Sequence, residues 1–391
     1  MNDADRGAAQ RAATATRAAF WIAGFGVAGW APLIPFARQR LQVGEATLGL
    51  LLLCLGIGSV AAMLRTGPLC ARHGCRPVVL GGALGMLLVL PLLAWTGTGL
   101  ALGLALLAFG AALGSLDVAM NVHAVAVERA AGRPQMSGFH ALFSLGGFAG
   151  AAAMTALLDH GLAPLPAAGA CALALLLPLW LAARGLLPDA GREPAAGTAG
   201  AAPDAGSGHT LAWPRGPVRL LAALAAACFL VEGALLDWGA LLLVDRALLP
   251  EARAGLGFVL FSVAMTAGRL TGDALVARWG ERAVLRTGGL LALAGFGLLA
   301  APGVVLALGG FALIGLGAAN VVPVLFRRAG AQTVMPPALA VSALTTIGYA
   351  GYLSGPALVG LVSQQIGLPA VFWGLAALMG LVPLTARRVA R

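Results

Sequence analysis

The sequence predicts an all-α membrane protein whose twelve transmembrane helices form two six-helix bundles. Three observations predict this fold: the composition, the recurrence of long apolar runs, and a repeat that relates the two halves of the chain. Of the 391 residues, 60% are hydrophobic and only 10% are charged, whereas an average soluble domain is about 25% charged. Apolar stretches of about 18 to 25 residues recur along the chain, and each can cross a hydrocarbon core of about 30 Å as a helix. A single stretch could be the core helix of a soluble protein, but twelve in series could not.

Six spans are predicted in each half of the chain. Those of the first half are 18–37, 46–65, 78–96, 99–126, 137–158 and 163–184. Those of the second half are 217–244, 254–274, 283–301, 303–326, 338–362 and 368–386. The segment between them is rich in Ala, Gly and Pro and has no apolar run long enough to insert. We therefore expect a cytoplasmic tail at 1–17, an N-terminal bundle at 18–184, a flexible cytoplasmic linker at 185–216, a C-terminal bundle at 217–386, and a cytoplasmic tail at 387–391.

The distribution of arginine predicts the orientation in the membrane. All of the basic charge is arginine, and the arginines stand at the ends of the apolar runs instead of along one basic surface, which argues against nucleic-acid binding. With the N-terminus inside, the cytoplasmic side receives about 20 arginines, and the other side receives only Arg38, Arg40, Arg246 and Arg253. Both termini and the linker are therefore expected in the cytoplasm of a bacterium, with the helices in its inner membrane. A full-length apolar run follows the polar start, so we expect no cleaved signal.

The cysteines and histidines indicate neither a disulfide framework nor a metal site. The cysteines lie in or beside apolar segments without paired spacing, at Cys54, Cys70, Cys75, Cys171 and Cys228. The short cluster of Cys70, His73 and Cys75 lacks a fourth metal ligand. We expect a monomer without a cofactor or a metal, whose partners are a small polar solute, protons and the lipid bilayer, and no nucleic acid.

The two halves share a repeated turn. The turn after the second span, residues 67–76, has the sequence GPLCARHGCR, and the turn after the eighth span, residues 273–282, has the sequence DALVARWGER. Arg72 and Arg278 occupy the same place in these turns, 206 residues apart. A unit of six spans has the same orientation in both copies, which is typical of the parallel repeat in transporter halves.

Twelve spans, a long central loop and this repeated turn together resemble the major facilitator superfamily over nearly the whole chain. The superfamily signature carries an aspartate in the turn, where this sequence has Ala71 and Ala277. This departure argues against the usual gating salt bridge in the first loop, and Gly272 and Asp273 are the candidates to replace it in the second. The resemblance implies gating roles, and the predicted gating residues are Arg72, Arg76, Arg269, Asp273, Arg278 and Arg282.

Two further strings narrow the resemblance. Residues 117–122, with the sequence DVAMNV, and residues 139–147, with the sequence FHALFSLGG, resemble a bacterial inner-membrane branch related to fucose permease. That resemblance implies a sugar or another small polar solute that moves together with protons.

Polar side chains within the spans are the candidates for transport. A charged side chain near the middle of the bilayer costs at least about 2.5 to 3.5 kcal/mol on insertion scales, so each one needs a reason. In the superfamily, spans one, four, seven and ten surround a central cavity, and the resemblance places this polarity along that pathway. The predicted substrate-binding residues are Trp30, Asp117, Asn121, Asp237, Trp238 and Asn320. The predicted proton-coupling residues are Glu232 and Asp117.

Helical spacing orders the acidic candidates. Asp117 and Asn121 are four residues apart, so they lie about 40° apart around a helix and can face one cavity. Glu232 and Asp237 are five residues apart and diverge by about 140°, so at most one of them points squarely at the cavity. Counted at about 1.5 Å per residue, Glu232 lies near mid-membrane and Asp237 nearer the outer side. Glu232 is therefore the preferred titrating group.

Each candidate also has a structural interpretation. The acids could hydrogen-bond neighbouring helices and serve packing only. His123 could join a proton relay, although a lone histidine near a helix end is more often structural. Arg269 and Asp273 are one turn apart, where an internal ion pair and a gate both fit.

We expect a secondary active transporter that moves a small polar organic solute by alternating access with proton coupling. A drug or metabolite exporter of the same fold is the alternative, and an aromatic content of 6% argues mildly against it. A membrane-embedded enzyme is a remote alternative because histidine and acidic residues coexist in the spans. The sequence contains no metal-ligand cluster or nucleophile elbow that supports an enzyme, so we expect none.

Overall fold

The computed structural model describes residues 3–43, 45–192, 213–249 and 255–390. Within these residues, every regular element is a helix. The helices of the first half are α1 (Asp3–Trp30), the short 3-10 helix η1 (Ala31–Leu33), α2 (Ile34–Leu41), α3 (Glu45–His73), α4 (Cys75–Trp95), α5 (Gly99–Ala131), α6 (Met136–Asp159), α7 (Pro164–Ala174) and α8 (Leu176–Gly185). Those of the second half are α9 (Pro217–Asp245), α11 (Leu256–Ala300), α12 (Val304–Ala318), α13 (Val321–Ala331), α14 (Pro337–Ile366) and α15 (Leu368–Val389).

The helices account for twelve membrane crossings. Ten helical stretches of the described residues are long and apolar enough to span a bilayer. One of them, α11, is two helices joined at Gly280, whose φ of 77° and ψ of 159° are not helical. In addition, α14 has 30 residues, more than the roughly 20 that a crossing requires. The predicted all-α fold with twelve transmembrane helices is confirmed.

The predicted repeat also appears in the backbone. Gly74, between α3 and α4, has φ 79° and ψ 164°, nearly the dihedral angles of Gly280, which lies 206 residues later. Gly161 and Gly367 keep the same offset, with φ values of 85° and 81°. Positive φ is the region that glycine adopts without steric cost. The two halves therefore turn at matching positions.

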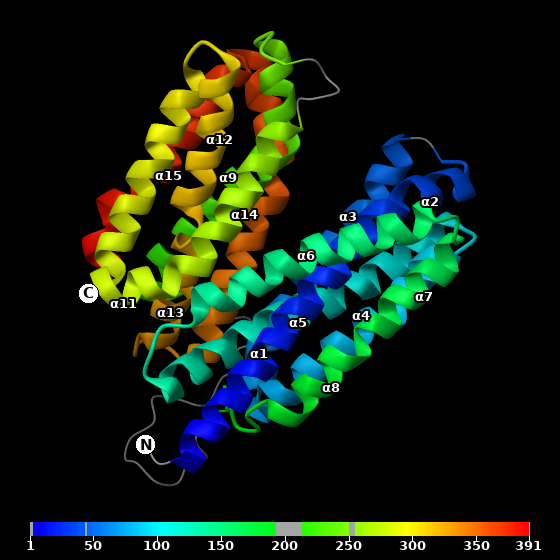
Figure 1. Cartoon of the computed structure of the whole chain (residues 1–391), viewed down its shortest axis with the longest axis vertical. Coiled ribbons are helices and arrows are strands. Elements are labelled where there is room, and N and C mark those ends of the chain that lie inside the picture. Colours follow the sequence, from blue (N-terminus) through cyan, green and yellow to red (C-terminus); the bar gives the residue numbers. More distant parts are fainter. Residues whose placement is uncertain (1–2, 44, 193–212, 250–254, 391) are drawn as a thin grey trace. The chain divides into compact units, whose positions relative to one another are not determined.

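The chain divides into two compact units. The first contains residues 1–132, 142–213 and 333–343, and the second contains residues 133–141, 214–332 and 344–391. Within the first unit, α1 packs on α5 and α8, and α4 packs on α5 and α7 (Figure 1). Within the second, α11 packs on α12 and α15, and α9 packs on α13 and α15 (Figure 1). Phe20 and Phe109 are fully buried in the first core, and Phe261 and Phe311 in the second.

The first helix begins earlier than predicted. The sequence predicts a tail at 1–17, but residues 3–17 form the first turns of α1. Their alanine-rich composition favours a helix, and Ala15 is fully buried. At the end of α8, a Cβ on Gly185 would lie 2.6 Å from the carbonyl oxygen of Arg11. These small side chains let α1 and α8 approach closely.

The predicted linker also begins later than expected. Leu186 and Ala190 are buried. The Leu187 amide donates to Nε2 of His123 over 2.9 Å, and the Cys75 amide donates to the Ala190 carbonyl over 2.8 Å. Residues 186–191 therefore have packing partners, which corrects the predicted start of the linker at residue 185. Residues 193–212 of the predicted linker lie outside the described residues.

Two spans predicted to be continuous are interrupted. The first span passes from α1 through η1 to α2 at Pro32 and Pro35, which lack the amide donor of a regular helix. The tenth span is broken between α12 and α13, where Asn320 has φ −105° and ψ 2°. Interrupted helices leave polar groups at membrane depth, and transporters often use them to line a binding site.

Candidate functional site

A polar pair on α5 is buried in the first unit. Asp117 and Asn121 are 8% and 0% exposed. The Asn121 side-chain nitrogen donates to the Asp117 backbone carbonyl over 2.9 Å and lies 3.5 Å from Asp117 Oδ1. The Asn121 Oδ1 atom is buried without a hydrogen-bond partner in the described part of the chain. An unpaired buried acceptor is costly, so this oxygen is suited to receive a hydrogen bond from a solute or a water molecule.

The first span contributes an indole at its interruption. Trp30 is the last residue of α1 and is 3% exposed. Its Nε1 atom is buried and has no hydrogen-bond partner among the described residues. The indole N–H can only donate. The contacting helices α1 and α5 therefore carry one unpaired donor and one unpaired acceptor, the two kinds of group that bind hydroxyls.

An acidic residue lies near the middle of α9 in the second unit. Glu232 is half-buried in this helix of 29 residues. Its carboxyl interacts electrostatically with Arg269 of α11, with Tyr352 of α14, and with the Cys228 thiol one turn earlier in α9. Arg269 is 7% exposed. A buried guanidinium needs an anionic neighbour, and Glu232 supplies one.

The second acid of α9 has a different environment. Asp237 is exposed, in keeping with the divergence that a spacing of five residues produces. The Tyr352 ring packs against Gly233, the residue after Glu232, since a Cβ on Gly233 would lie 3.2 Å from the ring atom Cδ2. Tyr352 also interacts electrostatically with Asp237. The two acids therefore share one aromatic neighbour, and Glu232 is the less exposed of the two.

Trp238 and Asn320 complete the polar groups predicted in the second unit. The Trp238 Nε1 atom is buried without a hydrogen-bond partner in the described residues. The Asn320 side-chain nitrogen donates to the Gly268 carbonyl over 3.0 Å, while its Oδ1 atom is buried and unpaired in the part of the chain that is described. Asn320 therefore ties the break between α12 and α13 to α11, next to Arg269.

Asp273 caps the first turn of α6 within the second unit. Its Oδ1 atom accepts from the Ser137 amide over 3.0 Å, and its Oδ2 atom accepts from the Gly138 amide over 2.7 Å. The first amides of a helix lack intrahelical partners, and the N-terminus carries partial positive charge. A carboxylate there satisfies both requirements.

Charged neighbours extend this cap. Arg327 of α13 lies 3.6 Å from Asp273 and 3.4 Å from Glu281, measured between nitrogen and oxygen, and Arg328 also pairs with Glu281. The four side chains are 12% to 27% exposed. Asp273 is thus paired with Arg327, and Glu232 interacts with Arg269.

The other predicted gating residues lie at the surface. The side chains of Arg72, Arg76, Arg278 and Arg282 are all exposed. In the first half, the counterpart of Asp273 is Gly67, where a Cβ would lie 2.5 Å from Cβ of Ser342. The Ser342 hydroxyl donates to the Met63 carbonyl over 2.8 Å. The first half therefore has a close packing contact where the second has a charged cap.

Comparison with known sequences gives the family. The sequence profile of the Major Facilitator Superfamily matches residues 18–327. The chain belongs to the Major Facilitator Superfamily. An uncharacterised MFS-type transporter of Yersinia pestis is 46% identical over 377 residues, which cover 96% of this chain and 95% of that protein. The membrane protein MosC of Rhizobium meliloti is 30% identical over 363 residues, covering 91% of this chain and 84% of MosC.

Solved structures show the same transporter fold. The E. coli fucose:proton symporter FucP matches with a TM-score of 0.76 and 17% identity, covering 97% of this chain and 98% of that one. The proton:xylose symporter XylE matches with a TM-score of 0.69 and 12% identity, covering 99% of this chain and 97% of that one. At these identities the likeness establishes the fold of the MFS transporter and not its solute.

Sequence reasoning missed several residues of these clusters. Arg327 and Arg328 contribute to the orientation count, but nothing in the sequence indicates that they pair with Glu281. The repeat does contain a signal for Glu281, because the second turn has this acid where the first turn has Cys75. The Ser137 amide carries no sequence signal, since any residue except proline supplies a backbone N–H.

Proposed function

We propose that this MFS transporter moves a small polar organic solute, with sugars as the leading class, across the bacterial inner membrane by alternating access and couples the movement to protons. The observation that carries the proposal is the set of ionisable side chains in the middle of bilayer-spanning helices, Asp117 on α5 and Glu232 beside Arg269. Ionisable groups at this depth mark substrate and proton pathways in membrane proteins. The likeness to symporters of fucose and xylose with protons supports the same solute class.

The unpaired polar atoms supply the solute-binding groups of this proposal. The indole nitrogens of Trp30 and Trp238 can donate, and the amide oxygens of Asn121 and Asn320 can accept. Each unit therefore carries one such donor and one such acceptor, and a polyhydroxy solute offers partners to both kinds of atom. Asp117 lies next to Asn121 and adds a second acceptor on α5. Asp237 is exposed, so we assign it a minor role in solute binding.

Glu232 is the proposed coupling residue. Its carboxylate balances the charge of the buried Arg269, so proton binding to Glu232 changes the net charge of the pair. A conformational change that depends on this charge is linked to the proton gradient. Neutral Gln mimics the proton-loaded state permanently. It should therefore leave exchange of solute intact while it removes the link to the gradient.

The test uses proteoliposomes and a solute identified by a thermal-shift screen of sugars, polyols and organic acids, because ligands that bind the folded state stabilise it. Counterflow exchange should survive in Glu232→Gln, and accumulation driven by a pH gradient should vanish. The matched control is Asp245→Asn, an exposed acid at the end of the same helix, which should keep both activities. Retained uphill uptake in Glu232→Gln would reject this residue as the coupling site.

The proposed orientation places both termini in the cytoplasm, as the arginine distribution predicts. Alkaline phosphatase is active only outside the cytoplasm. A fusion at Gly200 should therefore be inactive and a fusion at Gly99 active. Activity at Gly200 would overturn the orientation.

A further inference from the structure

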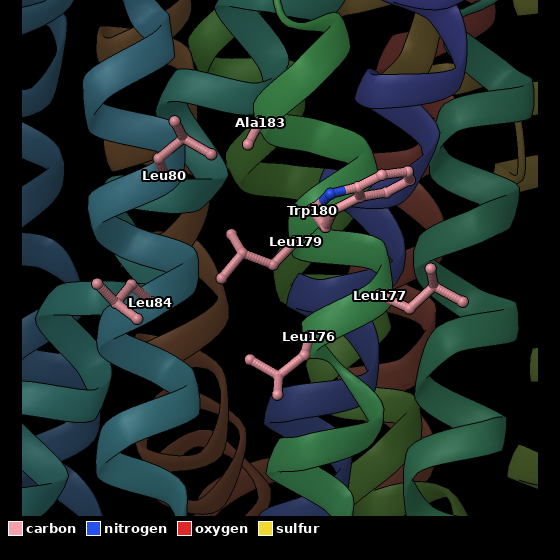
Figure 2. A pocket seen from close by; sticks show the side chains of 7 residues that line it. All are labelled: Leu80, Leu84, Leu176, Leu177, Leu179, Trp180 and Ala183. Carbon is pink, nitrogen blue, oxygen red and sulfur yellow. The ribbon is translucent and has the colours of Figure 1, made fainter.

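A hollow runs between α4 and α8 on the membrane-facing side of the first unit. It measures about 630 Å³, and its walls are five leucines of the two helices together with Trp180 and Ala183 (Figure 2). Both helices belong to apolar stretches long enough to cross a bilayer. Leu177 is 65% exposed and Trp180 is 48% exposed. The walls therefore face the lipid phase, where a hollow must be filled by lipid.

Two arginines are attached to one end of this groove. The Arg184 guanidinium lies over the Trp180 ring, with Cζ 4.1 Å from the ring centroid. The Arg76 Nη2 atom donates to the carbonyl of Ala183 over 3.0 Å. Both side chains are exposed, and neither has an acidic partner among the residues that the structure describes. The nearby Arg192 differs, because it pairs with Asp189 at 2.8 Å.

The two parts of the groove match the two parts of a phospholipid. The leucine walls extend over residues 176–183 of α8, a rise of roughly 10 Å, which is long enough to hold the upper part of an acyl chain. Tryptophan prefers the depth of the headgroups, where its ring meets apolar chains on one side and polar groups on the other. The arginines add two fixed positive charges at that depth, which favours an anionic headgroup over a zwitterionic one.

We propose that this groove is a binding site for an anionic phospholipid, with an acyl chain between α4 and α8 and the phosphate at Arg76 and Arg184. An arginine fork binds phosphate in a bidentate manner, and the Trp180 ring holds the Arg184 guanidinium in place for that contact. The site lies on the side that the arginine distribution assigns to the cytoplasm, where the leaflet carries anionic lipid. The bound lipid would hold the start of α4 to the end of α8.

The experiment compares two lipids with the same acyl chains. The full chain is purified in mild detergent and titrated with phosphatidylglycerol or with phosphatidylcholine, and native mass spectrometry counts the bound lipid. Phosphatidylglycerol should bind at least tenfold more tightly. The double variant Arg76→Gln with Arg184→Gln should lose roughly 30-fold in affinity for phosphatidylglycerol, the effect of two arginines beside an anionic headgroup. Its affinity for phosphatidylcholine should not change.

Three further measurements test whether the arginines and the groove together bind the lipid. The control Arg387→Gln with Arg388→Gln removes the same charge from the exposed end of α15 and should leave phosphatidylglycerol affinity unchanged. Leu84→Trp fills the groove and should weaken binding of both lipids. Glycerol phosphate, which has no acyl chain, should not displace the bound lipid.

Equal affinity of the wild-type chain for the two lipids, or an equal loss in the control variant, would overturn the proposal. If the double variant does not fold, Arg184→Gln alone should lose about fivefold, and no loss contradicts the site.

Discussion

Arg40 and Arg246 lie 206 residues apart, and each closes the same helix end in its own half of the chain. The Arg40 guanidinium donates to the carbonyls of Leu93, Ala94 and Thr96 over 2.7 to 2.8 Å at the end of α4. The Arg246 guanidinium donates to the carbonyls of Leu299, Ala300 and Ala301 at the end of α11. The last carbonyls of a helix have no intrahelical partner and carry partial negative charge. These two arginines therefore act as tertiary C-caps.

The first prediction is that Arg40→Gln and Arg246→Gln destabilise the transporter by similar amounts. Hydrogen bonds that involve a charged group each contribute about 1.5 to 3 kcal/mol, so we expect a loss of about 2 kcal/mol or more. Arg40→Lys keeps the charge but loses the fork of donors, and its effect should be intermediate. The measurement is thermal unfolding in detergent, with Arg388→Gln as the control. Equal midpoints for Arg40→Gln and the control would contradict the capping role.

These caps show how far sequence reasoning reaches. The sequence predicts the fold because apolar length and the repeated turn depend on local composition. It also marks Arg40 and Arg246 as exceptions to the arginine asymmetry, and the structure supplies the reason for them. What it cannot predict is pairing across distant segments. The contact of Asp273 with the Ser137 amide depends on how two helices meet, and the break at Asn320 depends on the Gly268 carbonyl beside it.

The second prediction concerns His123 and residues 186–191, which follow α8. His123 is fully buried, with Nδ1 3.0 Å from the Thr16 hydroxyl and Nε2 accepting from the Leu187 amide. Because Nε2 accepts, the proton of the neutral ring is assigned to Nδ1. Thr16 donates its own proton to the Ala12 carbonyl over 2.8 Å, so it can accept from the ring. This network indicates a structural histidine instead of a proton relay.

His123→Phe retains a ring and removes the acceptor of the Leu187 amide. Hydrogen exchange of peptides that cover residues 186–191 should therefore become faster. Without that hydrogen bond, local opening of this segment costs less free energy. The matched control is His73→Phe, since His73 is exposed at the end of α3. Exchange that is equally slow in both variants would remove His123 from this role.

The third prediction is that Asp117 and Asn121 bind the solute. Asn121→Ala removes a buried acceptor, and Asp117→Asn removes the charge beside it, so both should weaken binding by about tenfold, the effect of one hydrogen bond. Membrane abundance should not change. The measurement is solute-dependent thermal stabilisation of the purified variants. Unchanged affinity in both variants would leave these residues with a packing role only.

The last prediction is that the carboxylate of Asp273 both stabilises α6 and gates the transporter. Asp273→Asn keeps the shape of the side chain but removes its charge and one of its two acceptors. The Ser137 and Gly138 amides should then exchange faster, and the Arg327 guanidinium should lose its ion pair with Asp273. A carboxylate at a helix N-terminus contributes about 0.3 to 2 kcal/mol, so we expect a loss of about 1 kcal/mol in stability. The control is Asp189→Asn, whose ion pair with Arg192 is exposed and should contribute little.

A purely structural cap would alter stability and hydrogen exchange while leaving the rate of counterflow per folded molecule unchanged. A gate would also alter that rate, because the free-energy difference between the states that alternate would shift by the energy of the cap. Counterflow measured at matched amounts of folded protein separates the two roles, and an unchanged rate in Asp273→Asn would limit this carboxylate to capping α6.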